Sequence, residues 1–122
     1  MTKAKQTFHL LVLPRGEGAS CTFRVQVSPR ARLATLDKAI QRAMGCMPTD
    51  WSKFQQDGRE YGALFPERGE YVEESRDFAV KYLFTRPGDR AGYECLAVEP
   101  REYDVVLEAI SEDVAAAQVL DA

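Results

Sequence analysis

The sequence predicts an α+β fold in two layers, with antiparallel strands packed against helices. Three observations lead to this prediction. Residues 21–27 alternate apolar with polar side chains, and residues 78–84 alternate Phe, Val and Tyr with Ala79, Lys81 and Leu83. Residues 33–44 carry an apolar stripe at helical spacing, and turn-forming residues separate these segments. The chain has 122 residues, of which 45% are hydrophobic, so it is long enough to bury a core, and we expect a single domain over residues 1–122.

The first two segments predict a β-hairpin. Residues 8–13 are apolar and end at Pro14, and the loop that follows contains two glycines. In residues 21–27, phenylalanine and valine alternate strictly with polar side chains, as expected for a half-buried strand.

A helix is predicted next, because apolar residues recur every three or four positions. The stripe consists of Leu33, Leu36, Ile40, Ala43 and Met44. Gly45 suits the left-handed position after a helix, and Pro48 cannot continue the helix. Further on, Asp57-Gly58 is a strong signal for a two-residue hairpin turn, with Phe54 and Tyr61 on its two arms.

The second half predicts two more strands and a final helix. Residues 78–84 and 93–98 are the strands, separated by a turn at residues 86–89. From Pro100 onwards, helical spacing relates Tyr103, Val106, Leu107, Ile110 and Val114. A strand through residues 103–110, followed by a short helix capped by Ser111, is the alternative, and the sequence leaves this choice open.

The predicted order is therefore β-β-α-β(β)-β-β-α. A hairpin crossed by one helix and followed by further antiparallel strands is β-grasp-like. Residues 7–98 would form the α+β body, and residues 99–122 an acidic C-terminal helix.

Several of these residues also form a pattern that resembles the plasmid pRiA4b ORF-3-like family. The pattern consists of Leu33-x-x-Leu36-x-x-x-Ile40-Gln41-x-Ala43-Met44-Gly45, the aromatic residues Trp51 and Phe54, Gly58-x-x-Tyr61-Gly62, and Tyr82-Leu-Phe84 followed by Gly88-Asp89 and Tyr93. The chain departs from the family at Cys46, where the family has tryptophan, and at Thr85, where it has aspartate. It also lacks the family's downstream tryptophan and histidine. The resemblance covers residues 7–98 and implies a fold and an association with plasmids, phages and other mobile elements, but no activity.

Charge is distributed unevenly along the chain. Residues 1–59 carry ten Lys or Arg and four Asp or Glu, whereas residues 99–122 carry one basic and seven acidic residues. The net charge of the whole chain is −3. This gradient indicates either two faces that bind partners or an acidic end that folds against the basic start.

The candidate binding residues come from both ends of this gradient. The basic set would contact an anionic protein or nucleic-acid phosphates, and two aromatic residues follow the helix. The candidates form three sets: the basic residues Arg24, Arg30, Arg32, Lys38 and Arg42, the aromatic residues Trp51 and Phe54, and the acidic residues Glu108, Glu112 and Asp113. The sequence pI of about 5.2 and the absence of a known nucleic-acid-binding motif favour a protein partner.

Nothing in the sequence indicates catalysis. His9 is the only histidine and lies in the first apolar segment, where a packed or edge-strand role is expected. The cysteines Cys21, Cys46 and Cys95 are widely spaced and form no paired metal-binding motif. The acidic clusters are sequence neighbours, which is typical of a solvated surface. We therefore expect no enzymatic activity, no metal and no cofactor.

The expected location is the cytoplasm, because the N-terminal residues show no signal peptide and the odd number of cysteines fits a reducing compartment. No segment has the length and hydrophobicity of a membrane span. These features predict a non-enzymatic protein-interaction module from a mobile element. Its most specific form would be a phage or plasmid inhibitor of a host defence nuclease complex, comparable to an anti-CRISPR protein. The alternative is a nucleic-acid-associated accessory protein that uses the basic residues between positions 24 and 42. The sequence leaves the oligomeric state open.

Overall fold

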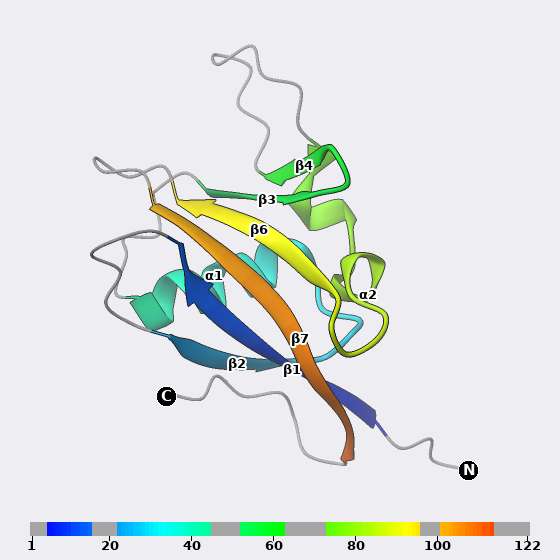
Figure 1. Cartoon of the computed structure of the whole chain (residues 1–122). Coiled ribbons are helices and arrows are strands. Elements are labelled where there is room, and N and C mark those ends of the chain that lie inside the picture. The colour runs from blue at the N-terminus through cyan, green and yellow to red at the C-terminus, as the bar shows by residue number, and fades with distance from the viewer. Residues whose placement is uncertain (1–4, 16–21, 45–51, 63–72, 96–100, 114–122) are drawn as a thin grey trace.

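The protein is built on one large sheet. A computed structural model describes residues 5–15, 22–44, 52–62, 73–95 and 101–113. In this part of the chain, seven strands lie in the order β2-β1-β7-β6-β3-β4-β5 (Figure 1). The strands are β1 (Lys5–Pro14), β2 (Phe23–Val27), β3 (Ser52–Gln56), β4 (Arg59–Gly62), β5 (Glu73–Glu74), β6 (Arg90–Cys95) and β7 (Arg101–Asp113). Neighbouring strands are antiparallel except for the short pair β4 and β5.

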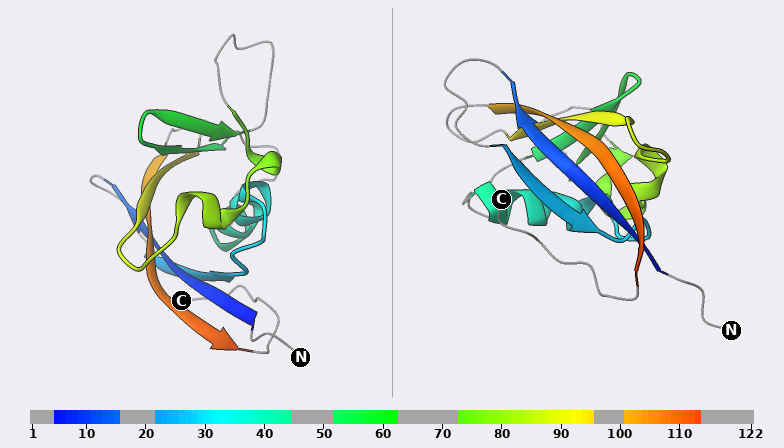
Figure 2. Two further views of the ribbon diagram at one scale, coloured as in Figure 1. Left: turned by 90° about the vertical axis from the view of Figure 1, so that its right-hand side faces the viewer. Right: turned by 60° about the horizontal axis from the view of Figure 1, so that its bottom comes forward.

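Two helices lie on one face of the sheet, which curves around them (Figure 2). The longer one, α1 (Leu33–Met44), has the bounds that the apolar stripe predicts. The shorter one, α2 (Val80–Leu83), follows a single 3-10 turn at Ser75–Asp77. We call the side of the sheet that faces α1 and α2 the inner face and the opposite side the outer face.

Both predicted hairpins are confirmed. Strand β1 pairs with β2 over five residues, from Phe8 opposite Val27 to Val12 opposite Phe23. Strand β3 pairs with β4, with Phe54 opposite Tyr61. The turn between them has φ of 52° at Asp57 and 79° at Gly58, and such positive values at both central residues match the right-handed twist of the strands.

The core lies between the inner face and the helices. Strand residues alternate, so that one side chain in two points inward, and the apolar stripe of α1 covers them. The most deeply buried residues are Leu10, Val12, Val25, Leu33, Leu36, Ile40, Phe54, Val80, Phe84, Tyr93, Val105 and Leu107. Because α1 supplies three fully buried side chains to this cluster, the sheet depends on it for its cover.

The predicted two-layer α+β class is wrong, because the described part of the chain is predominantly β. The acidic C-terminal helix predicted for residues 99–122 is also wrong over residues 101–113. Residues 101–113 form β7, which lies between β1 and β6. The register between β1 and β7 shifts between His9 and Leu10: His9 faces Ala109, and Leu10 faces Leu107. Glu108 is therefore the extra residue of a β-bulge.

This bulge explains why the sequence suggested a helix there. Glu108 and Ala109 are both exposed, so the inward positions jump from Leu107 to Ile110. A spacing of three imitates helical periodicity. The alternative of a strand over residues 103–110 is confirmed. Its second part, a short helix capped by Ser111, is wrong, because Ser111 lies within β7, which ends at Asp113.

The predicted strand at residues 78–84 is also wrong, because this segment contains α2. Its alternating aromatic residues suit a strand, but Val80, Leu83 and Phe84 share one helical face and are the residues that become buried. Phe78 is only half-buried and Tyr82 is exposed. The sequence contains both periods, and backbone hydrogen bonds between residues 78–81 and residues 29–33 accompany the helical one.

We predict that truncating the buried stripe of α1 destabilises the protein strongly. Leu36→Ala or Ile40→Ala removes a side chain with no exposed surface, so each should lower the free energy of unfolding by about 2–5 kcal/mol. Urea unfolding followed by circular dichroism measures this change. Thr35→Ala, at an exposed position of the same helix, is the control and should change the value by less than about 0.5 kcal/mol.

Candidate interaction surface

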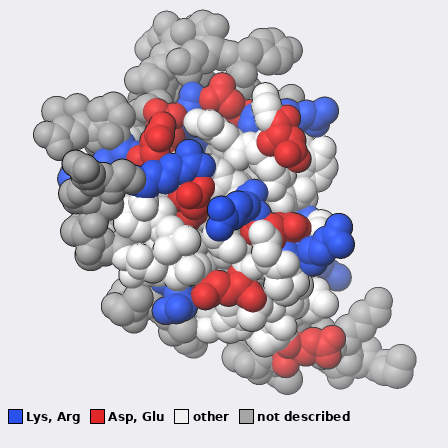
Figure 3. Space-filling view, in the orientation of Figure 1, with Lys and Arg blue, Asp and Glu red and all other residues white. Residues whose placement is uncertain are grey.

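The outer face of the sheet carries charges of both signs that are paired with one another. The guanidinium of Arg24 on β2 lies 2.9 Å from the Glu108 carboxylate on β7. The ammonium of Lys53 on β3 lies 2.5 Å from Glu60 on β4 and 3.8 Å from Glu94 on β6. The space-filling view of this face shows blue and red side chains interspersed (Figure 3). Local neutralisation leaves little net field for attracting a charged partner here.

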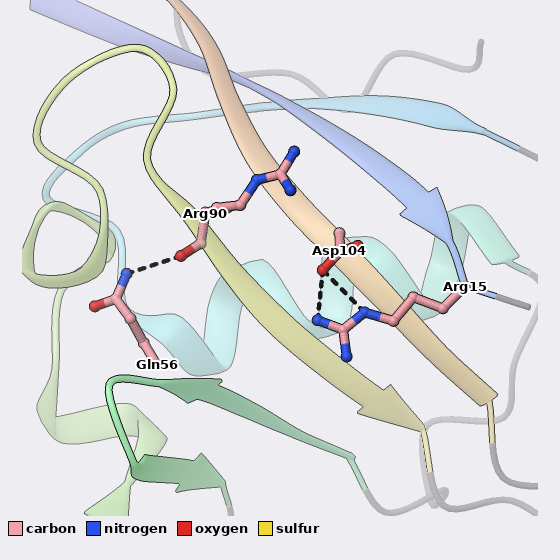
Figure 4. A network of polar contacts seen from close by, with 4 residues as sticks. All are labelled: Arg15, Gln56, Arg90 and Asp104. Atoms are coloured by element: carbon pink, nitrogen blue, oxygen red, sulfur yellow. Dashed lines mark hydrogen bonds and ion pairs between the residues drawn. The ribbon is translucent and has the colours of Figure 1, made fainter.

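A further pair on this face is bidentate. Arg15 donates through both Nε and Nη2 to Oδ1 of Asp104, and a separate contact nearby joins the Gln56 amide to the Arg90 carbonyl oxygen (Figure 4). The hydrogen bonds from Arg15 hold the pKa of Asp104 below its usual range, and the same contact raises the pKa of Arg15. The Arg15 side chain is 47% exposed and that of Asp104 is 26% exposed, so solvent screens the pair and it contributes little to stability.

The pairing decides one question that the sequence left open. Arg24 and Glu108 belong to the predicted basic and acidic sets, and they contact each other. At this point the acidic end of the chain lies against the basic start. Glu112 is exposed farther along β7. Asp113 is the last residue of that strand.

The other predicted cations lie on the helical layer. All are exposed, and they form none of the ion pairs found within the described residues. Together with a lysine of α2 that the sequence analysis did not single out, they form what we call the basic helical face: Arg30, Arg32, Lys38, Arg42 and Lys81.

Local structure explains why these cations stay exposed. Lys38 and Arg42 are four residues apart on α1, opposite its buried stripe, so they point away from the sheet. Arg30 and Arg32 precede the helix. Lys81 joins them because its backbone N–H donates to the Pro29 carbonyl at 2.9 Å.

The two predicted aromatic contacts do not join this face. Phe54 is fully buried, with its ring 5.0 Å from that of Tyr93, so the prediction of a surface role for it is wrong. Its inward position follows from its register opposite Tyr61 and Tyr93 on the inner face. Trp51 lies outside the described residues.

Tyr82 is the aromatic residue that the structure exposes instead. It is 54% exposed and lies on α2, with its ring 5.1 Å from that of Phe78 and 6.4 Å from that of Tyr61. A strand over residues 78–84 would place Tyr82 among the inward side chains, so it is absent from the predicted surface residues. A helical reading with Val80, Leu83 and Phe84 buried would have exposed it.

His9 makes cross-strand contacts on the outer face. Its Nε2 lies 2.7 Å from the Ser111 hydroxyl, and its Nδ1 lies 3.2 Å from the Gln26 amide nitrogen. A serine next to a histidine is the start of a nucleophile–base arrangement, but an amide occupies the position where a carboxylate would orient the imidazole. The three residues act as a polar ladder across β2, β1 and β7.

A second polar network joins α1 to the inner face. One oxygen of the Asp37 carboxylate accepts hydrogen bonds from the Tyr93 hydroxyl at 2.6 Å and the Gln41 amide at 3.0 Å, and the other accepts from the Ser52 hydroxyl at 2.5 Å. Tyr93 is almost fully buried. Burial raises the pKa of its phenol far above the ordinary value, and the neighbouring Asp37 adds to the shift. Each of the three donors is directed at the same carboxylate, so the network anchors the helix to the sheet.

The described residues contain neither a cluster of metal ligands nor a helix that could span a membrane. No group of three or more histidine, cysteine, aspartate or glutamate side chains is arranged there to hold a metal ion. Within the same ranges, neither helix has the length and apolar character needed to cross a membrane.

Comparison with known proteins gives a similar solved structure. No model of a known protein family matches the chain, and no curated protein does. The crystal structure of MM3350 from Methanosarcina mazei Go1, a protein of unknown function, is similar with a TM-score of 0.76 and 19% sequence identity. The match covers 97% of this chain and 69% of that one. At this identity the similarity shows a shared fold only.

We predict that Tyr93 makes the protein less stable in alkaline solution. Because the folded state raises the pKa of this phenol above the unfolded value of about 10, its contribution to stability is complete below pH 10 and is lost above it. The free energy of unfolding should fall by up to about 1.4 kcal/mol per pH unit from this group alone.

Urea unfolding at pH 9, 10 and 11 measures this slope. Tyr93→Phe should be less stable than the wild type at pH 9, where it lacks the hydrogen bond to Asp37, but its slope above pH 10 should be shallower. Tyr82→Phe, which changes an exposed tyrosine, should keep the wild-type slope. Equal slopes for the wild type and Tyr93→Phe would contradict the assignment.

Proposed function

We propose that the chain is a non-enzymatic protein-interaction module that binds an acidic partner through the basic helical face. The observation that carries this proposal is the contrast between the two sides of the sheet. Three of the cations on the outer face, Arg15, Arg24 and Lys53, are paired with carboxylates. Arg90 on the same face forms no ion pair but lowers the pKa of Asp104. The five cations of the helical layer have no ion-pair partner among the described residues. Exposed cations without a counter-charge are available for an anionic surface.

The resemblance to the pRiA4b ORF-3-like family adds a biological setting to this proposal. A small module of a plasmid or phage that binds an acidic host surface would suit an inhibitor of a defence nuclease complex, as anti-CRISPR proteins are. This step rests on the association of that family with mobile elements. The partner would then be a host protein or a protein–nucleic acid complex.

Direct binding of nucleic acid is the alternative. The basic helical face would contact phosphates in the same way as carboxylates. Arg24, which the sequence analysis placed in that set, points to the outer face and is paired with Glu108. The overall charge of −3 also opposes a long polyanion. We therefore place the protein partner first.

Capture from a lysate of the source organism, with and without nuclease treatment, distinguishes these two functions. A partner that is retained after the treatment supports the protein-interaction module. Loss of all bound material after the treatment supports the nucleic-acid-associated protein and contradicts the first proposal.

We predict that reversing the helical cations weakens binding of the captured partner. A variant with Arg32→Glu, Lys38→Glu and Arg42→Glu should stay folded, because exposed charges contribute little to stability. Its affinity at low salt should fall at least about tenfold, with slower association, since like charges now oppose each other at the interface. Surface plasmon resonance measures both quantities.

The matched control reverses three other exposed arginines by the same total charge. Arg59→Glu, Arg86→Glu and Arg101→Glu lie outside the basic helical face, and this variant should bind much more tightly than the first. If the two triple variants lose affinity equally, net charge and not the helical face governs binding, and the proposal is wrong.

A further inference from the structure

Tyr82 is the large apolar side chain that the described part of the chain leaves mostly exposed. Its ring is held by its neighbours. Phe78 and Tyr61 pack edge-on with their ring centroids 5.1 Å apart, and Tyr82 rests on both of them. An exposed ring fixed in this way loses little conformational entropy when a partner covers it.

Backbone hydrogen bonds also fix the segment that carries Tyr82. Residues 78–81 run alongside residues 29–33: Val80 N–H donates to the Ala31 carbonyl at 2.7 Å, and Leu33 N–H donates to the Phe78 carbonyl at 2.8 Å. An isolated antiparallel bridge joins Arg32 to Ala79 between these contacts. The short helix α2 is thereby tied to the start of α1.

This pairing brings two basic backbone segments together at the helix that carries Tyr82. Lys81 precedes Tyr82 in α2, and its N–H donates to the carbonyl oxygen of Pro29, the residue before Arg30. Arg32 lies across the bridge from Ala79. The backbone pairing thus brings three cations, Arg30, Arg32 and Lys81, into the two segments that meet next to Tyr82. None of them forms an ion pair within the described ranges.

We propose that Tyr82 is the anchor point of the basic helical face, and that the partner segment it binds is an acidic peptide with an aromatic side chain. This inference rests on the proposed function and names the chemistry of the partner. The partner's ring would pack on Tyr82, while its carboxylates would meet Lys81, Arg30 and Arg32. Tyrosine and arginine are the residues that most often dominate the energy of protein interfaces.

The same surface suits a peptide better than a nucleic acid. Asp77, exposed next to Phe78, adds a negative charge close to the aromatic cluster and would repel a continuous phosphate backbone. A peptide can place its acidic residues toward the cations and a neutral residue toward Asp77. Single-stranded nucleic acid also requires several stacking rings along its path, and Tyr82 is the single large exposed ring in the described residues.

Two labelled peptides test the inference by fluorescence anisotropy at low ionic strength. One carries a tryptophan between two runs of three glutamates, and the other has alanine in place of the tryptophan. The wild type should bind the tryptophan peptide about tenfold more tightly, which is the upper range for one aromatic pair. Tyr82→Ala should abolish this preference, and Tyr82→Phe should keep it.

Further variants separate this inference from the proposed function. Tyr82→Leu keeps an apolar cover over Phe78 and serves if Tyr82→Ala does not fold; it should also reduce the preference. The variant with Arg32→Glu, Lys38→Glu and Arg42→Glu should weaken both peptides and leave their ratio near the wild-type value. If that variant weakens both peptides but Tyr82→Ala keeps the tenfold preference, the anchor is wrong and the basic helical face stands.

Two other results would overturn the inference. The first is that the wild type binds neither peptide at millimolar concentration, which rules out an acidic peptide as the partner. The proposed function would not fall with this result, because the partner captured from the lysate tests it separately. The second is a twelve-nucleotide oligothymidylate that binds more tightly than both peptides and depends on Tyr82. That result would assign the surface to nucleic acid.

Discussion

The pairing of β1 with β7 is the interaction on which the rest of the structure depends. Ten residues of β1 have a partner in β7, from Lys5 opposite Asp113 to Pro14 opposite Tyr103. Because β7 also pairs with β6, it connects the first hairpin to the strands that follow α1. Without it, the described strands would divide into two small sheets, and a two-stranded hairpin is marginally stable by itself in water. The inward side chains Leu10, Val12, Val105 and Leu107 would then lose their common core.

The same pairing determines how charge is distributed in space. It places the acidic strand β7 beside the strands of the basic N-terminal half, so carboxylates such as Asp104 and Glu108 meet Arg15 and Arg24 on the outer face. The cations of the helical layer lie on the other side of the sheet and gain no such partner among the described residues. The charge gradient along the chain therefore becomes a difference between a strand layer in which several cations are paired with carboxylates and a helical layer in which they are not. Sequence order alone would have suggested two charged ends.

The parts of the fold that the sequence predicted are those in which local signals agree with one another. Leu33 to Met44 has helical periodicity only, and Asp57-Gly58 has turn chemistry that few alternatives share. Residues 78–84 and 101–113 contain both periods, and long-range contacts decide between them. The bulge at Glu108 shifts the inward positions of β7 by one residue, which no local pattern reveals. In α2, the choice depends on hydrogen bonds from residues 78–81 to residues 29–33, which are distant in sequence.

In the candidate surface too, the sequence predicts what local patterns determine and not what long-range contacts determine. Lys38 and Arg42 could be placed from the helix period, because exposure on an amphipathic helix is a local property. Arg24 was grouped with them, but its strand turns it toward Glu108. The proximity of Lys81 and Tyr82 to Arg30 and Arg32 arises only when two segments about fifty residues apart pair along their backbones. This surface exists only when both segments are folded. A partner that binds it therefore recognises the folded helical layer of this protein and not a continuous stretch of its sequence. An aromatic ring on α2 and cations before α1 can then act together only in the native state.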